Sequence, residues 1–151
     1  MKRVIQPHIV FAFERGGGFT AELLNDLAPT TVAYVLELLP LEATVYHTRW
    51  CGREVYIPIE NKKPVPPENQ TIQTSTGDVV FWQEWGKGKE ALQTISVYYG
   101  PELVRDHRGF LPVNVFGRVP QSQWRNIEAI GLRIWQQGIE RVRIEIRERP
   151  S

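Results

Sequence analysis

The sequence predicts a mainly β protein: a closed, antiparallel, eight-stranded barrel with two helices capping its open ends. Three observations lead to this fold class. About eight short segments are rich in branched and aromatic residues, and several alternate between apolar and polar side chains. Only two segments have the periodicity of an amphipathic helix. The first and last predicted strands can pair with each other, which would close the sheet and remove its edges.

Composition fits one globular domain. The chain has 151 residues, of which 42% are hydrophobic and 23% charged, so we expect residues 1–151 to form a single domain. No apolar run approaches the roughly 20 residues that span a bilayer, and no secretory leader follows the basic start. We therefore expect a cytoplasmic protein without a membrane partner. The net charge is +1 with both signs mixed along the chain, which does not favour nucleic-acid binding.

The first third of the chain predicts a hairpin followed by a helix. Residues 8–14 form the first predicted strand, and residues 19–24 pair back onto it after a glycine-rich turn. A helix follows over 29–39, with Pro29 at its first position. Its apolar face comprises Val32, Val35, Leu36 and Leu39, and Pro40 ends it.

The middle of the chain predicts strands separated by polar loops. The expected strands are 43–50, 54–59, 77–82, 92–100 and 113–119. Residues 51–53 reverse the chain between the first two of them. The proline-rich segment 60–70 and the segment 101–112 are expected to be surface loops.

The last third predicts a helix and a closing strand. A helix is expected over 122–137, with Ser122 as its cap and Gly138 beyond its end. Its expected buried stripe is Trp124, Ile127, Ile130, Ile134 and Trp135. The final strand alternates cleanly, so Val142, Ile144 and Ile146 are expected to face inward.

The order of these elements resembles the cyclophilins, which are eight-stranded antiparallel barrels with a helix at each end. "LLNDLAPTTVAYVLELL" is similar to the cyclophilin segment around "AP-x-T-V", and "YHTRW" to the strand that carries "FHR". "LPVNVFGRV" is similar to the "HVVFGKV" strand that precedes the second helix. The resemblance implies the barrel fold, and it implies Arg49 as the counterpart of the catalytic arginine.

The chain also departs from the cyclophilins. Thr48 separates His47 from Arg49, the "QGG" motif is absent, and "TISVYYG" replaces the "SQFF" motif. Phe110 is the nearest aromatic residue to the position of a missing tryptophan. The pattern "HxRWxGxExxxPI … ENQT … GDVVFW … YYG … N-x-F" looks more like the bacterial cyclophilin-like family of unknown function, DUF3830. Membership of that family implies the fold but not an activity.

His47 and Arg49 are the first candidates for a site. They would share one face of the predicted strand, because side chains alternate along a strand. A guanidinium group can hold a carbonyl or carboxylate through two parallel hydrogen bonds. The alternative for both residues is a solvated outer face. With the resemblance, we expect Arg49 to line a pocket.

Aromatic and polar residues of other segments complete the predicted site. Tyr98 and Tyr99 are adjacent, so only one of them can line a given pocket. For the aromatic residues, Trp82 included, the alternative is ordinary barrel core, and for 68–70 it is turn chemistry. The predicted ligand-binding residues are His47, Arg49, Trp50, Tyr56, Glu68, Asn69, Gln70, Tyr98, Tyr99, Phe110 and Asn114.

No metal site or cofactor is expected. His8, His47 and His107 lack the spacing of metal ligands. Cys51 could be a nucleophile with His47 as its base, but its place in a predicted hairpin turn favours an incidental thiol. The glycine-rich segments match neither a Walker loop nor a dinucleotide-binding motif.

Three functions remain open from the sequence. The favoured one is a binding protein for a small carboxylate- or amide-bearing ligand, or a peptide, held in a cleft on the barrel wall. The second is a peptidyl-prolyl isomerase with Arg49 as its catalytic arginine, but the shortened loops and altered motifs argue against this activity. The third is a structural or accessory subunit of a larger enzyme. A homo-oligomer is compatible with all three.

Overall fold

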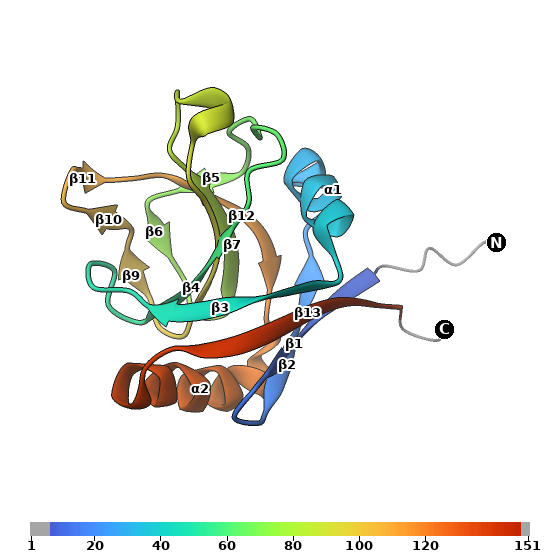
Figure 1. Cartoon of the computed structure of the whole chain (residues 1–151), viewed down its shortest axis with the longest axis vertical. Coiled ribbons are helices and arrows are strands. Elements are labelled where there is room, and N and C mark those ends of the chain that lie inside the picture. The colour runs from blue at the N-terminus through green and yellow to red at the C-terminus, as the bar shows by residue number, and fades with distance from the viewer. Residues whose placement is uncertain (1–6, 149–151) are drawn as a thin grey trace.

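The structure, a computed structural model, describes residues 7–148. Eight strands close into a barrel (Figure 1): β1 (Pro7–Phe13), β2 (Gly18–Leu23), β3 (Leu41–His47), β4 (Glu54–Ile59), β7 (Asp78–Gln83), β8 (Gln93–Tyr98), β12 (Val113–Arg118) and β13 (Glu140–Glu148). Around the barrel they run β2, β1, β13, β3, β4, β8, β7 and β12, and β12 pairs with β2 to complete the ring. Every pair is antiparallel. The predicted mainly β, closed eight-stranded barrel is confirmed, and the fold is cyclophilin-like.

The first and last strands pair, as the sequence predicts. The register of β1 and β13 runs from Pro7 opposite Glu148 to Phe13 opposite Val142. Val142 and Ile144 are buried as expected, but the prediction for Ile146 is wrong, because this side chain is 45% exposed. At Ile146 the strand has passed the last residue that it pairs with β3, which is Ile144.

Helix α1 (Pro29–Leu38) matches its prediction closely. Pro29 lies in its first turn, and Val32 and Val35 are buried in the core. The helix ends before Pro40, which has no amide hydrogen to continue it. Within residues 7–148, no helix has the length and apolar character needed to cross a bilayer.

Helix α2 (Trp124–Gln137) lies on another side of the barrel, against β2, β3 and β4 (Figure 1). It ends at Gly138 as predicted: this residue has φ of 92°, and its N–H donates to the Ile134 carbonyl. The prediction of Ser122 as the cap is wrong. Ser122 lies in a short 3₁₀ turn, and Gln123 occupies the cap position with its side chain bonded to Thr20 of β2.

The buried stripe of α2 is narrower than the sequence predicts. Ile127, Ile130 and Ile134 are buried, together with Gly131. Trp124 is 36% exposed and Trp135 is 63% exposed, so their predicted burial is wrong. The ring of Tyr99 occupies the space beside Gly131, where an added Cβ would lie 2.3 Å from Tyr99 Cε1. The helix therefore approaches the barrel through its glycine and isoleucines.

Five two-residue strands lie within or just after the segments predicted as loops, 60–70 and 101–112. They are β5 (Gln70–Thr71), β6 (Gln73–Thr74), β9 (Glu102–Leu103), β10 (Arg105–Asp106) and β11 (Gly109–Phe110). β5 adds to the barrel at β12, β6 pairs with β9, and β10 pairs with β11. A 3₁₀ turn (Gly88–Glu90) lies between β7 and β8. In Figure 1 the chain from β9 to β11 extends away from the barrel on the side opposite α1.

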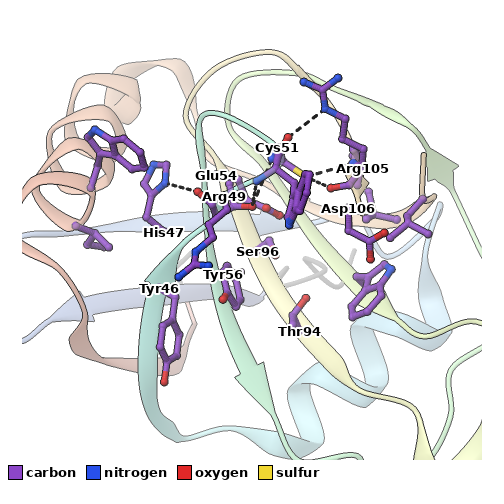
Figure 2. Close-up of a pocket in the computed structure, with 18 of the residues that line it drawn as sticks. Tyr46, His47, Arg49, Cys51, Glu54, Tyr56, Thr94, Ser96, Arg105 and Asp106 are labelled. Atoms are coloured by element: carbon purple, nitrogen blue, oxygen red, sulfur yellow. Dashed lines mark hydrogen bonds between the residues drawn. The ribbon is translucent and has the colours of Figure 1, made fainter. Parts of the chain in front are cut away.

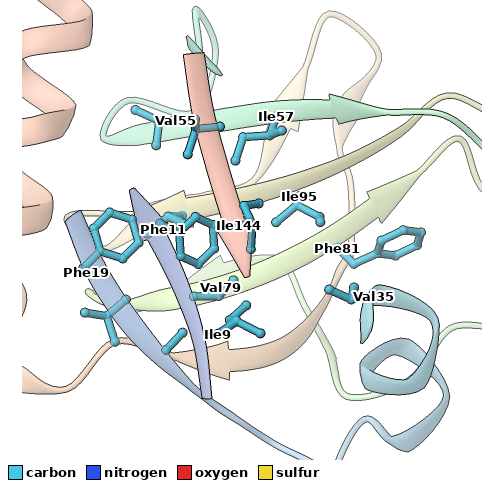
Figure 3. Packing of buried hydrophobic residues seen from close by; sticks show 14 of the residues in the cluster. Ile9, Phe11, Phe19, Val35, Val55, Ile57, Val79, Phe81, Ile95 and Ile144 are labelled. Carbon is cyan, nitrogen blue, oxygen red and sulfur yellow. The ribbon is translucent and has the colours of Figure 1, made fainter. Parts of the chain in front are cut away.

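Each face of the barrel wall packs against a different hydrophobic cluster. Inward-facing side chains such as Val55 and Ile57 of β4 and Ile95 of β8 form the main core (Figure 3). Alternate residues of the same strands point outward, as strand geometry requires. On the outer face a second, smaller cluster joins the wall to the segment from β9 to β12, and its buried members are Cys51, Val80, Tyr98, Val104, Val113 and Val115. This second cluster holds the β9–β11 segment against the barrel.

Candidate functional site

A groove of about 730 Å³ lies on the outer face of the barrel wall. β3, β4, β8 and β7 contribute its floor, and the end of α2 and the β9–β11 segment contribute opposite sides (Figure 2). The residues that line it are Tyr46, His47, Thr48, Arg49, Trp50, Cys51, Glu54, Tyr56, Trp82, Thr94, Ser96, Val104, Arg105, Asp106, Leu111, Val113, Ile134, Trp135, Gly138 and Ile139.

Aromatic side chains form much of the groove. Tyr46 and Tyr56 face each other on neighbouring strands and stack, with ring centroids 5.5 Å apart. Trp50, Trp135 and Ile139 line the groove and are largely exposed. Large apolar side chains that are exposed around a concave surface are typical of a ligand-binding site.

Arg49 lies in the bend between β3 and β4. β3 ends at His47, so the predicted strand 43–50 is three residues too long, and the alternation argument does not extend to Arg49. Arg49 is exposed and lines the groove. Among the described residues, it forms no ion pair. Burial raises the pKa of the Tyr56 hydroxyl, and the positive charge of Arg49 acts in the opposite direction.

His47 lies at one side of the groove, between the barrel and α2. Its Nδ1 is 2.9 Å from the Thr48 carbonyl, and its Nε2 is 2.6 Å from the Tyr99 hydroxyl. The carbonyl can only accept, so Nδ1 carries the proton and the neutral ring accepts from Tyr99 through Nε2. Burial lowers the pKa of His47, and its bond to the Thr48 carbonyl opposes that change. His47 is therefore neutral at physiological pH.

Glu54, the first residue of β4, places a buried carboxyl group in the groove. It is only 7% exposed, and it lines the cavity. Burial raises its pKa to about 6, although the nearby hydroxyls of Tyr98, Ser96 and Thr48 and the Cys51 thiol favour the charged form and so act in the opposite direction. No ion pair of residues 7–148 includes Glu54. The groove thus contains a carboxyl group that no cation of the described residues neutralises.

Tyr98 lies behind Glu54, opposite it in the pairing of β4 with β8. The residue is fully buried, and its hydroxyl has no well-formed hydrogen bond within residues 7–148. Burial raises the pKa of this hydroxyl far above its ordinary value, and the nearby Glu54 carboxyl and Cys51 thiol raise it further. Tyr98 therefore remains protonated and can only offer a neutral dipole to Glu54.

Cys51 connects the bend to the β9–β11 segment. Its Sγ donates to the Arg105 carbonyl at 2.9 Å and accepts from the Arg105 amide at 3.3 Å. Burial raises the pKa of the thiol, and the charge of Glu54 raises it further. A thiol in this setting is a poor nucleophile, because the thiolate is the reactive form. Two further contacts hold the same two segments together: Arg105 Nε donates to the Trp50 carbonyl, and Arg53 Nε to Glu102.

The structure places the predicted polar residues of 68–70, and Asn114, away from the groove. Asn114 is fully buried, and its carbonyl oxygen accepts from the Glu68 amide and from Gln70 Nε2. Its Nδ2 donates to Thr31 Oγ1 and to the Pro66 carbonyl. The Glu68 carboxylate accepts from the Thr31 amide. These groups attach the 60–70 segment to β12 and α1.

The remaining predicted residues fall in three places. Four of them line the groove: His47, Arg49, Trp50 and Tyr56. Asn69 donates to the Val115 carbonyl, and Phe110 is exposed on β11 outside the lining. Tyr98 and Tyr99 face opposite ways, as predicted, but neither lines the groove. Tyr98 lies beside Glu54, and the Tyr99 hydroxyl contacts His47.

Glu54 is the residue that sequence reasoning missed. A signal for it was present, since it precedes the alternating run "VYIPI" and must share a face with Tyr56. Its burial had no local signal, because the β9–β11 segment, about 50 residues later in the chain, is held over the Cys51 end of the bend. Within residues 7–148, no three histidine, cysteine, aspartate or glutamate side chains gather to hold a metal ion.

Two of the solved structures that are similar to this barrel illustrate the likeness. A structure of McbB in complex with tryptophan has a TM-score of 0.68 and 21% identity, and the match covers 91% of this chain and 44% of that chain. This chain therefore spans less than half the length of McbB. The solution structure of a hypothetical protein from Archaeoglobus fulgidus has a TM-score of 0.63 and 23% identity, covering 95% of this chain and 97% of that chain. At these identities the likeness shows the fold alone.

A family model gives a more specific result. No curated protein matches the sequence. The model of a family described as "Protein of unknown function (DUF3830)" matches residues 12–146, which include both helices and the whole lining of the groove. The chain therefore belongs to the DUF3830 family.

Proposed function

We propose that the protein binds a small ligand in the groove on the barrel wall, and that the ligand has an apolar or aromatic body and a carboxylate. The observation that carries this proposal is Arg49, an exposed guanidinium in an aromatic groove that is paired with no acid among the described residues. A carboxylate can accept two parallel hydrogen bonds from such a group, and no existing ion pair has to break first.

The shape of the groove supports a small molecule. Its volume, about 730 Å³, lies within the range of roughly 300–1,000 Å³ that is usual for ligand sites. The stacked Tyr46–Tyr56 pair and the exposed Trp50 and Trp135 offer flat apolar surfaces for a ring or an alkyl chain. The similar structure of McbB holds tryptophan, which has both a ring and a carboxylate, so indole carboxylates are reasonable first probes.

Titration calorimetry with indole-3-propionate and its neutral amide tests the proposal. We expect the acid to bind more tightly than the amide, and Arg49→Ala to weaken the acid at least about tenfold, the value of a charge-assisted hydrogen bond. Arg125→Ala is the matched control, because Arg125 is an exposed arginine of α2 outside the groove. Equal affinity of acid and amide, or an acid that binds Arg49→Ala as well as the wild type, would overturn the proposal.

The same samples separate binding from isomerisation. A prolyl-peptide assay with the wild type and Arg49→Ala measures whether this arginine accelerates rotation about the X–Pro bond. Under the binding proposal we expect no acceleration that depends on Arg49. An isomerase activity that disappears in Arg49→Ala would instead assign this groove to peptidyl-prolyl isomerisation.

A further inference from the structure

The groove contains a second charged group that the proposed function does not use. Glu54 lines the cavity, yet its side chain is almost completely buried, and no cation within residues 7–148 forms an ion pair with it. An isolated carboxylate is costly to bury, so proteins usually pair it or bind a cation with it. Here the neighbouring groups are all neutral dipoles: the hydroxyls of Thr48, Ser96 and Tyr98, and the thiol of Cys51.

Glu54 and Arg49 belong to the same hairpin but do not satisfy each other. The Thr48 amide donates to the Glu54 carbonyl at 3.1 Å, which brings the two arms of the bend together next to Arg49. Figure 2 shows Arg49 and Glu54 in the same part of the groove. No ion pair within 4.0 Å joins them. One groove therefore presents a positive and a negative group that are separate and both unpaired.

We propose that Glu54 receives a protonated amine of the ligand, so that the groove takes a zwitterion of the amino-acid class. The inference rests on the proposed function: Arg49 holds the carboxylate, Glu54 holds the ammonium group, and the side chain of the ligand lies on the aromatic walls. A ligand with both charges neutralises Glu54, which has no cation partner in the part of the chain that the structure describes. It also binds more tightly than a simple acid, which Glu54 repels, or a simple amine, which Arg49 repels.

Three ligands with one ring system separate the two charges. L-tryptophan has both charges, indole-3-propionate has only the carboxylate, and tryptamine has only the ammonium group. In calorimetric titrations we expect Glu54→Gln to weaken tryptophan and tryptamine at least about tenfold and to leave indole-3-propionate unchanged or tighter. Arg49→Ala should weaken tryptophan and indole-3-propionate but not tryptamine. Glu90→Gln, at an exposed glutamate outside the groove, is the matched control.

The affinity of tryptamine for the wild-type protein gives a test that needs no variant. Protonation removes the charge of Glu54 below a pH of about 6, so tryptamine affinity should fall as the pH drops from neutral to about 5. Glu54→Gln should abolish this dependence. Other groups that titrate or carry charge around Glu54 are Cys51, Tyr56, Tyr98, His47, Arg49, Arg105 and Asp106. His47 is a further weak base at the groove whose pKa burial lowers, so a His47→Gln variant measures its contribution to the pH dependence.

The outcomes distinguish the two proposals. If indole-3-propionate binds through Arg49 while Glu54→Gln leaves tryptophan and tryptamine unchanged, this inference is overturned and the proposed function stands. If tryptamine depends on Glu54 while indole-3-propionate ignores Arg49, the proposed function is overturned. A parallel series of leucine, 4-methylpentanoate and 3-methylbutylamine covers an aliphatic body. If no member of either series binds at millimolar concentration, both proposals are overturned.

Discussion

Replacing Glu54 with glutamine should stabilise the protein at neutral pH and leave its stability almost unchanged at about pH 4. The reason is the buried, unpaired carboxyl group. Burial raises the pKa of Glu54 from an ordinary value of 4.5 to about 6 in the folded protein. Between these two values the folded state binds more protons than the unfolded state, so the free energy of unfolding falls as the pH rises. Glutamine, which is neutral and has a similar shape, does not have this penalty.

The pKa difference sets the size of the effect. At about 1.4 kcal/mol per pH unit, a pKa that rises from 4.5 to about 6 corresponds to about 2 kcal/mol. The contribution of the protonated carboxyl is fully present below about pH 4.5 and is lost as the pH rises through about 6. For a domain of this size, about 2 kcal/mol also corresponds to a rise of roughly 4–8 °C in Tm above pH 7.

Urea unfolding of the wild type and Glu54→Gln, measured at several pH values from about 4 to 8, gives the required difference. Tryptophan fluorescence is a suitable signal, because the chain has five tryptophans. Taking the difference between the two proteins cancels groups that titrate in both, including His47. Glu90→Gln, at an exposed glutamate outside the groove, is the matched control. A stability difference that stays constant with pH, or that grows towards acid, would refute the assignment of Glu54 as a buried carboxyl without a cation.

Three further predictions concern the surroundings of the site. Asn114→Ala should lower the free energy of unfolding in urea by about 2–4 kcal/mol, because the buried partners of its amide lose their hydrogen bonds. It should not change ligand affinity in the groove. The control Gln70→Ala, at an exposed residue, should lower the free energy of unfolding by less than half as much. Gly131→Ala should lower the free energy of unfolding by about 1–3 kcal/mol, despite the better helix propensity of alanine, because its Cβ would meet the Tyr99 ring at 2.3 Å. The control Asn126→Ala, on the exposed side of α2, should not lower it. Equal effects of the two substitutions would contradict the crowding argument. In an NMR titration the His47 ring should change protonation below pH 6.5, because burial lowers its pKa; a midpoint above 6.5 would show that a negative charge, and not burial, dominates there.

Local patterns in the sequence were enough to predict the barrel. The strand 54–59 was predicted with its exact bounds, because period-two alternation is a property of the residues themselves. The pairing of the first and last strands followed from the need to cover sheet edges, and β1 and β13 do pair. Helix α1 was predicted within one residue, because Pro29 and Pro40 restrict its start and its end.

The predictions are wrong where contacts with a distant segment of the chain determine the local structure. Ser122 has the right chemistry for a cap, but the Gln123 side chain bonds to β2 and the α-helix begins after it. Trp135 continues an apolar stripe, yet it lies exposed beside the groove. For the site, the resemblance led to Arg49 and His47, whereas the burial of Glu54 depends on packing that a single local pattern does not contain. The hydrogen-bonding groups of Asn114 and Glu68, which predict a ligand site, instead bond to other parts of the fold.

The two-sided barrel wall has a consequence for how this protein can diversify. Val55 and Ile57 face the interior, whereas Tyr56, between them on the same strand, faces the groove, and Ser96 is its outward-facing neighbour on β8. Mutations at the outward positions change the lining of the groove without creating cavities in the barrel, so selection can act on the two sets separately. A library randomised at Tyr46, Tyr56, Thr94 and Ser96 would therefore sample new ligand specificities on a scaffold whose folding is set by the residues in between.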